Sequence, residues 1–365
     1  MENRIIIIPI AFIIILSLFS LIGFLSFSMF NKIFYKKKIK NLIYFSLIIN
    51  GFYLLSFFLK FFINNGFINS LQKILNYYFG FLLYGGITGL IFWLVYFLLK
   101  IIKKNEIITK KVVGCFALFL IVSINILAIY NFEKDLAIKN FTFETDKIQK
   151  DYSFVQIADT QYGSVSQKHF QESFELAAQQ NPDFIVFVGD LVDFDNYKKE
   201  DFDFMRDLKV PIFFERGNHE FYHGTERLMS YLEDIENLEL LINKKSHFDE
   251  IEIVGIDYSQ EKDYLKNELS NIEIDSNQFS ILLYHEPKDL EEGVKKGFDL
   301  ILSGHTHGGQ IFPFNKLMTL IYKYGSGFYE EDKTKIYTTD GAGLFGPNMR
   351  LGSQNEIVLF KLNKI

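Results

Sequence analysis

The sequence predicts an α/β protein that begins with a transmembrane region of four helices. Two observations predict the membrane region. The first 131 of the 365 residues hold nearly all of the long apolar runs, and they carry 13 of the 38 basic residues but only two of the 44 acidic ones. A third observation predicts the α/β domain, because short β-rich runs alternate with helical stretches after residue 150. We therefore divide the chain into a transmembrane region (1–131), a linker (132–150) and an α/β domain (151–365).

Four apolar runs are each long enough to cross a hydrocarbon core of about 30 Å as a helix. They span 5–30, 42–63, 74–99 and 112–130. A cleavable signal peptide is the alternative for the first run, but that run is too long and only Arg4 precedes it as a base. Lys60 is the only formal charge inside a span, and transporters usually carry ionisable groups at mid-membrane. The spans therefore predict an anchor rather than a transporter.

Basic residues in the loops predict the orientation of these helices. The first and third loops each contain five lysines, whereas the second contains only Lys73. Loops one and three should therefore be cytoplasmic, which places the α/β domain on the extracytoplasmic side.

The α/β domain is predicted from eight β-rich runs and three helical stretches. We expect strands at 154–158, 184–188, 212–214, 251–256, 279–284, 300–302, 335–338 and 356–362. We expect helices at 167–180, 227–235 and 288–296. Residues 132–150 mix charges without clear periodicity, which favours a linker.

Carboxylate, amide and imidazole side chains follow five of these strands, beside glycines that allow tight turns. Ligands of open α/β sheets bind just beyond the carboxyl ends of strands. The segments are Asp159-Thr160-Gln161, Gly189-Asp190 to Asp193, Gly217-Asn218-His219-Glu220, His285-Glu286-Pro287 and Gly304-His305-Thr306-His307-Gly308-Gly309-Gln310. We therefore expect these side chains to converge on one site.

The donor types predict a metal site of oxygen and nitrogen ligands. This mixture suits Mn, Zn or Fe, and thiolate ligation is excluded because the single cysteine, Cys115, lies in the predicted membrane region. The acidic α/β domain would repel phosphate backbones, so no nucleic-acid partner is expected.

The five motifs, in this order, resemble those of the calcineurin-like metallophosphoesterases. The closing segment, from Gly341-Ala342-Gly343-Leu344 through Arg350 to Glu356-Ile357-Val358-Leu359, resembles the membrane-associated bacterial branch of that family. The resemblance covers about residues 150 to 365. It implies two packed mixed β-sheets flanked by helices, with two divalent cations between the loops at the strand ends. It also implies that water activated by these cations attacks phosphorus.

The resemblance assigns a role to each motif residue. The first metal would take Asp159, Gln161, Asp190 and His307, and the second would take Asp190, Asn218, His285 and His305, so that Asp190 bridges them. His219 would contact the phosphate, with Asp190 and His219 as the catalytic pair. The first motif usually ends in His, and the weaker amide ligand of Gln161 should favour Mn at that site.

Other polar residues have weaker assignments. Asp193 should either orient a ligand or cap a helix. Arg350 is either a clamp for the substrate phosphate or a surface residue. His169, His223 and His247 fit no motif and are expected to face solvent.

These observations predict a multi-pass protein of the bacterial plasma membrane that hydrolyses a phosphate mono- or diester. An envelope or lipid-linked ester is a candidate substrate, membrane lipids are expected partners, and the oligomeric state is not predicted. The alternative is a metal-poor pseudoenzyme that acts as a membrane-tethered binding module.

Overall fold

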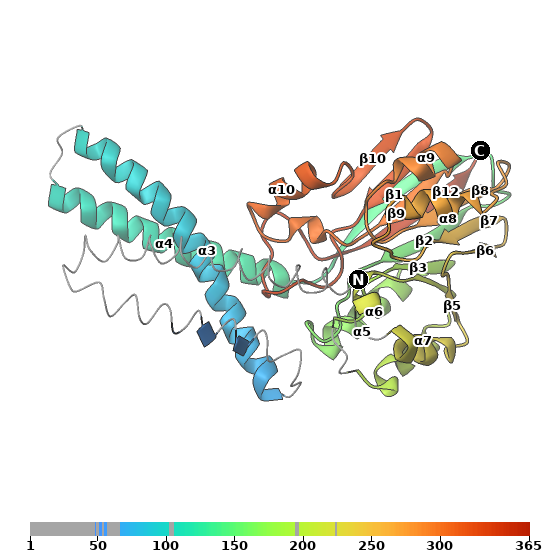
Figure 1. Cartoon of the computed structure of the whole chain (residues 1–365), viewed down its shortest axis with the longest axis horizontal. Coiled ribbons are helices and arrows are strands. Elements are labelled where there is room, and N and C mark those ends of the chain that lie inside the picture. The colour runs from blue at the N-terminus through green and yellow to red at the C-terminus, as the bar shows by residue number, and fades with distance from the viewer. Residues whose placement is uncertain are drawn as a thin grey trace. The chain divides into compact units, whose positions relative to one another are not determined.

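The computed structural model describes residues 48, 51–52, 55–56, 66–101, 106–193, 197–222 and 225–365 (Figure 1). The chain divides into two compact units. The first comprises Met1–Asn131 with Gly346–Met349, and the second comprises Phe132–Phe345 with Arg350–Ile365.

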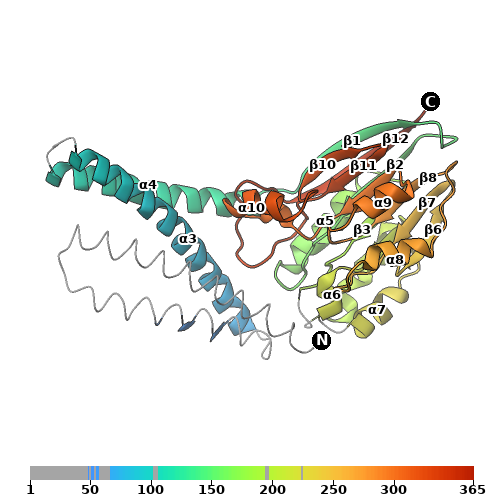
Figure 2. The same cartoon turned by 45° about the horizontal axis from the view of Figure 1, so that its top comes forward.

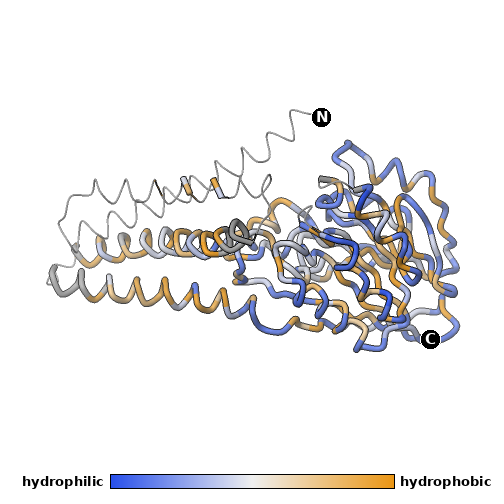
Figure 3. Tube along the Cα trace, turned by 90° about the horizontal axis from the view of Figure 1, so that it is seen from below, coloured by the Kyte–Doolittle hydropathy of each residue, from blue (hydrophilic) through white to orange (hydrophobic). Residues whose placement is uncertain are grey.

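The described part of the first unit consists mainly of two long helices, α3 (Gly66–Ile101) and α4 (Glu106–Glu133). Both are apolar along most of their length, as the mainly orange and white tube of Figure 3 shows. By length and composition, Ile74–Leu99 and Gly114–Glu133 are able to cross a membrane. The predicted spans 74–99 and 112–130 lie in these helices. The predicted span 5–30, and all but a few residues of 42–63, lie outside the described residues.

The second unit contains two six-stranded sheets. The first has the order β1-β12-β2-β3-β4-β5, and the second has the order β10-β11-β9-β8-β7-β6. The strands are β1 (Ala137–Thr145), β2 (Tyr152–Ile157), β3 (Phe184–Val188), β4 (Ile212–Glu215), β5 (Leu238–Leu240), β6 (Lys244–Phe248), β7 (Ile251–Gly255), β8 (Phe279–Leu283), β9 (Leu300–Ser303), β10 (Gly327–Glu331), β11 (Thr334–Thr338) and β12 (Glu356–Lys364). Both sheets are mixed, because β12 pairs antiparallel with β2, and β6 and β10 pair antiparallel with their neighbours.

Helices cover the outer face of each sheet (Figures 1 and 2). On the first sheet they are α5 (Gln167–Ala178), η1 (Lys199–Leu208) and α7 (Thr225–Glu233), and on the second sheet they are α8 (Tyr264–Ser270) and α9 (Glu291–Lys296). The unit also contains α6 (Asn218–Tyr222), η2 (His307–Gly309) and α10 (Phe314–Ile321). Side chains of β2 and β3 alternate between two cores. Val155 and Phe187 pack outward against α5 and α7, while Phe154 and Val186 pack inward against the second sheet. On the second sheet, Leu282 faces α8 and α9. The predicted architecture of two packed mixed sheets flanked by helices is confirmed.

The eight predicted strands coincide with observed strands, but the predicted linker is wrong in part. Residues 137–145 of that segment form β1, which pairs in parallel with β12. Phe141 and Phe143 point to the same side of this strand, and Phe143 is buried in the core between the sheets. This period-2 alternation stabilises a strand despite the mixed charges around it.

Parallel pairing brings the site segments together. Strands β2, β3 and β4 are adjacent and parallel in the first sheet, and β8 and β9 are parallel in the second. Because parallel strands end at the same edge, the loops after all five strands meet at one end of the sandwich.

Candidate metal centre

The seven predicted ligands lie in the loops that follow these strands. Six of them are buried and His305 is half-buried. Asp159 and Gln161 follow β2, Asp190 follows β3, Asn218 begins α6 after β4, His285 follows β8, and His305 and His307 follow β9.

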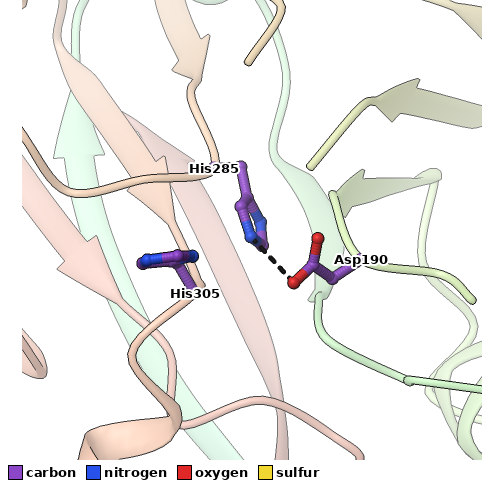
Figure 4. Close-up of side chains that lie close together, drawn as sticks. All are labelled: Asp190, His285 and His305. Carbon is purple, nitrogen blue, oxygen red and sulfur yellow. Dashed lines mark ion pairs between the residues drawn. The ribbon is translucent and has the colours of Figure 1, made fainter. Parts of the chain in front are cut away.

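Three of the predicted ligands form one compact cluster. Ligand atoms of Asp190, His285 and His305 all lie within 4.8 Å of one another (Figure 4). Nε2 of His285 is 3.2 Å from Oδ2 of Asp190 and 3.1 Å from Oδ1 of Asn218. The same Asn218 oxygen is 2.7 Å from Nδ1 of His305. One carboxylate, one amide oxygen and two imidazoles therefore converge.

The tautomer of His285 is fixed by its other ring nitrogen. Nδ1 lies 2.9 Å from the carbonyl oxygen of Val188, which can only accept, so Nδ1 carries a proton. A neutral His285 then presents the lone pair of Nε2 to oxygens of Asp190 and Asn218. Three acceptors would face each other in a buried space, and this arrangement needs either an extra proton or a cation.

The carboxylates around His285 favour its protonated form. Burial lowers the pKa of His285, but Asp190 and other carboxylates raise it well above its ordinary value. Burial and the neighbouring His285 lower the pKa of His305 to about 3, so His305 is neutral at pH 7. Burial raises the pKa of Asp159 to about 7.

The other predicted ligands lie beside this cluster. Nε2 of Gln161 donates to Oδ2 of Asp190 over 2.9 Å, and Nε2 of His307 is 3.5 Å from Oδ1 of Asp159. Among the described residues, the buried atoms Oε1 of Gln161 and Nδ1 of His307 have no hydrogen-bond partner. A buried polar atom without a partner costs about 1–3 kcal/mol, so both atoms are candidate metal donors.

Five of the seven predicted ligands have backbones in the left-handed region. The φ angles are 54° for Asp159, 51° for Gln161, 59° for Asp190, 72° for His305 and 48° for His307. Asp and His enter this region more readily than most residues, but each such conformation still costs free energy. Its concentration in these loops is typical of a functional site.

Glycines of the motifs leave room for the ligand side chains. A Cβ on Gly217 would lie 2.2 Å from Oδ1 of Asp190, and a Cβ on Gly304 would lie 2.4 Å from Oδ2 of Asp159. Both distances are far below van der Waals contact. These positions are glycine because the two carboxylates occupy the space that a side chain would fill.

His219 lies between two carboxylates. Its main-chain N–H donates to Oδ1 of Asp190, and its Nδ1 is 2.9 Å from Oδ1 of Asp193. Burial lowers the pKa of His219, but Asp190 and Asp193 raise it to about 9. Asp193 therefore orients His219 and favours its protonated form.

Glu220 is a structural residue of the site to which sequence reasoning assigned no role. Its buried carboxylate accepts hydrogen bonds from four main-chain N–H groups, those of Asp190, Leu191, Val192 and Gly217. It thereby ties the loop after β3 to the loop after β4. The only signal in the sequence was its place directly after His219.

Arg350 takes neither of its predicted roles. It is completely buried, and its guanidinium donates to the carbonyl oxygens of His307, Asp340 and Gly343. Arg350 therefore holds the loop of His307 in place through main-chain carbonyls. Its buried guanidinium is not accessible to a phosphate.

Two of the remaining histidines are described. His169 is half-buried, with Nε2 2.8 Å from the carbonyl oxygen of Ala342, so the prediction that it faces solvent is wrong. His247 is exposed on β6, as predicted, and His223 lies outside the described residues.

The fold and the site define a metallophosphoesterase. Residues 152–309 match the calcineurin-like phosphoesterase family. An uncharacterized metallophosphoesterase of Aquifex aeolicus is 30% identical over 244 residues, which cover 61% of this chain and 90% of the relative. The chain therefore belongs to the calcineurin-like metallophosphoesterases, a family of metal-dependent phosphoric ester hydrolases.

Two further relatives are similar over the same domain. An uncharacterized metallophosphoesterase of Campylobacter jejuni is 34% identical over 246 residues, or 64% of this chain and 65% of the relative. The match thus spans just under two thirds of that protein. A transmembrane protein with a metallophosphoesterase domain from Danio rerio is 28% identical over 232 residues, or 56% of this chain and 51% of the relative.

Proposed function

We propose that this protein is a membrane-anchored phosphoesterase that uses two divalent cations to hydrolyse a phosphate mono- or diester. The observation that carries the proposal is the convergence of acceptor atoms from Asp190, Asn218 and His285 in a buried space. Such a set is stable only with a positive charge at its centre.

The residues fit two cations. His307, Asp159 and Gln161 would hold one, and Asn218, His285 and His305 would hold the other, with Asp190 contributing to both. Oε1 of Gln161 and Nδ1 of His307, which lack partners among the described residues, are suitable donor atoms for the first. When bound, a metal pair of this kind acts as a Lewis acid towards water and the phosphoryl group. The neutral Gln161 favours Mn at the first position.

In this proposal His219 supplies a proton, and Asp193 orients the imidazole of His219. His219 is held by Asp193, and the neighbouring carboxylates favour its protonated form, so it is suited to neutralise a phosphoryl oxygen or to protonate the leaving oxygen. No serine or cysteine nucleophile is required, because water is the attacking group in this scheme.

Membrane anchoring is supported by the two long apolar helices. Only residues 134–136 separate the end of α4 from β1, so little chain lies between the second apolar helix and the hydrolase domain. We propose that both helices span the bacterial plasma membrane together with the predicted spans 5–30 and 42–63. The lysine-rich first and third loops support an extracytoplasmic hydrolase domain. An envelope or lipid-linked phosphoester is then an accessible substrate.

The test combines metal content with turnover. The full chain, purified in detergent and loaded with Mn²⁺, should hydrolyse p-nitrophenyl phosphate or bis(p-nitrophenyl) phosphate. Asp190→Asn and His305→Ala should each lower kcat by at least about a thousandfold, since each removes a metal ligand. His247→Ala, at an exposed position on β6, is the control and should keep full activity.

The pseudoenzyme alternative predicts a different result. The loaded protein would then hold fewer than one metal ion per chain, and neither ester would be hydrolysed faster than in the two variants. That outcome would overturn the proposed function.

A further inference from the structure

Helix α10 carries an apolar face that is exposed to solvent. Leu317, Leu320 and Ile321 are 45%, 81% and 63% exposed, and their i, i+3, i+4 spacing puts them on one side of the helix. Phe312, just before α10, is 45% exposed. Scattered apolar residues are ordinary on protein surfaces, but four within ten residues are typical of an interaction surface.

This apolar face belongs to the loop that carries two predicted metal ligands. Gly309, in the same motif as His305 and His307, lies directly under α10, because a Cβ there would be 2.4 Å from Cα of Asn315. On its other side, Asn315 donates to the carbonyl oxygen of Gly352. The helix is therefore held in a fixed place beside the site.

Two aromatic side chains connect the exposed face to the site. Tyr322 follows α10 directly, and its ring packs edge-on against His305 with the centroids 6.0 Å apart. Phe345 is 44% exposed, donates its main-chain N–H to Oε1 of Gln310, and packs edge-on against His219. Apolar surface thus flanks the predicted centre on two sides.

We infer that α10 docks on the surface of a lipid bilayer, and that the substrate is a phosphoester of a membrane lipid whose acyl chains stay in that bilayer. The inference rests on the proposed function, and it adds the substrate class and the surface that presents it. Hydrolysis would add one water across a P–O ester bond, leaving the phosphate on one product and a hydroxyl on the other.

A bilayer is favoured as the occupant for two reasons. The same chain carries two helices able to cross a membrane, and only three residues connect the second of them to β1. Such a short connection would keep the domain close to the bilayer and raise the effective concentration of lipid at its surface. The sequence of α10 also contains a lysine, Lys316, and no acidic residue. Apolar side chains beside a lysine are typical of helices that lie in the interface of anionic membranes.

The docking step is tested by fluorescence. The full chain has one tryptophan, Trp93, which is replaced by Phe. Leu320→Trp is then added, and the protein is reconstituted in phosphatidylcholine–phosphatidylglycerol vesicles. Brominated acyl chains should quench the introduced tryptophan, and aqueous iodide should not. Lys266→Trp, at an exposed position on α8, is the control and should be quenched by iodide only.

Two results would overturn docking. Quenching of the position-320 tryptophan by iodide would show that α10 faces water. Protection from both quenchers would show that protein covers it, either another part of this chain or a second copy.

The substrate class is tested with Leu320→Glu in the same vesicles. Hydrolysis of phosphatidic acid or phosphatidylglycerol should fall about tenfold, because burial of one leucine is lost, while hydrolysis of a soluble ester stays unchanged. Leu320 is largely exposed, so the fold should tolerate the change; Lys266→Glu is the matched control.

Soluble-ester turnover without lipid turnover by the parent protein would overturn the lipid inference and leave the proposed function standing. Quenching by lipid without turnover of any ester would overturn the proposed function instead.

Discussion

At the scale of single residues, hydrogen-bond partners fix how the side chains of the site are oriented. The carbonyl of Val188 fixes the proton of His285 on Nδ1, which leaves Nε2 to face the oxygens of Asp190 and Asn218. At Glu220 the side chain is the acceptor, since four main-chain N–H groups of two loops donate to its carboxylate. The carboxylate of Glu220 thereby fixes the position of the backbone at Asp190.

Glu220→Gln should therefore damage both stability and activity. The amide keeps one acceptor oxygen but turns an NH₂ group towards two N–H donors, which should lower the free energy of unfolding by about 1–3 kcal/mol. Chemical unfolding in detergent, followed by circular dichroism, measures the change.

Glu226→Gln is the control for this variant, because Glu226 is exposed on the neighbouring helix α7 and should shift stability by less than about 0.5 kcal/mol. Equal stability of the two variants would show that the carboxylate of Glu220 does not hold the loops.

The sequence predicted which residues would gather, but not the residues that hold them in place. Asp159, Asp190, His285 and His305 were identifiable because polar side chains after apolar strands have a known location in α/β sheets. Arg350 was not, because its acceptors are main-chain carbonyls of His307, Asp340 and Gly343, whose positions depend on the folded loops. A buried arginine and an exposed one have the same local sequence pattern.

At the scale of elements, strand β1 shows how a weak pattern is stabilised by its neighbours. Its residues mix charges, yet Phe143 is buried, stacks with Phe328 of β10 and packs at a tilt against Phe360 of β12. The short apolar strands β3 and β8 were predicted almost to the residue because all their side chains are buried. Strand β1 was missed because only part of one face is buried.

Phe143→Ala tests whether β1 is a part of the folded domain. Loss of a buried phenylalanine should lower the free energy of unfolding by about 3–5 kcal/mol. Thr142→Ala, at the adjacent exposed position, should have little effect. Thermal unfolding of both variants measures this, and a neutral Phe143→Ala would mean that residues 137–145 behave as a linker after all.

At the scale of the whole molecule, the two parts of the chain carry net charges of opposite sign. Residues 1–131 carry a formal net charge of +11 and residues 132–365 carry −17. Within the second part, Asp159, Asp190, Glu215 and Glu220 are all buried near the predicted centre. Burial raises the pKa values of Asp159, Glu215 and Glu220. A cation bound among these carboxyls would favour their ionised forms.

Metal binding should therefore stabilise the whole domain. A free Mn²⁺ concentration about one hundred times its Kd would add about 2.7 kcal/mol to the free energy of unfolding. The unfolding midpoint should rise on addition of Mn²⁺ and fall again with a chelator. Asp190→Asn should remove most of the rise. An identical midpoint with and without metal in the parent protein would contradict a metal centre at this position.

The order of strands in the first sheet has a consequence for biosynthesis. Strand β12 lies between β1 and β2, although it follows every other strand of the domain along the chain. Neither neighbour can complete its pairing until the ribosome has released the segment 356–364. If the domain is exported while it is being synthesised, this sheet can close only after strand β12 has crossed the bilayer, so translocation precedes completion of the fold.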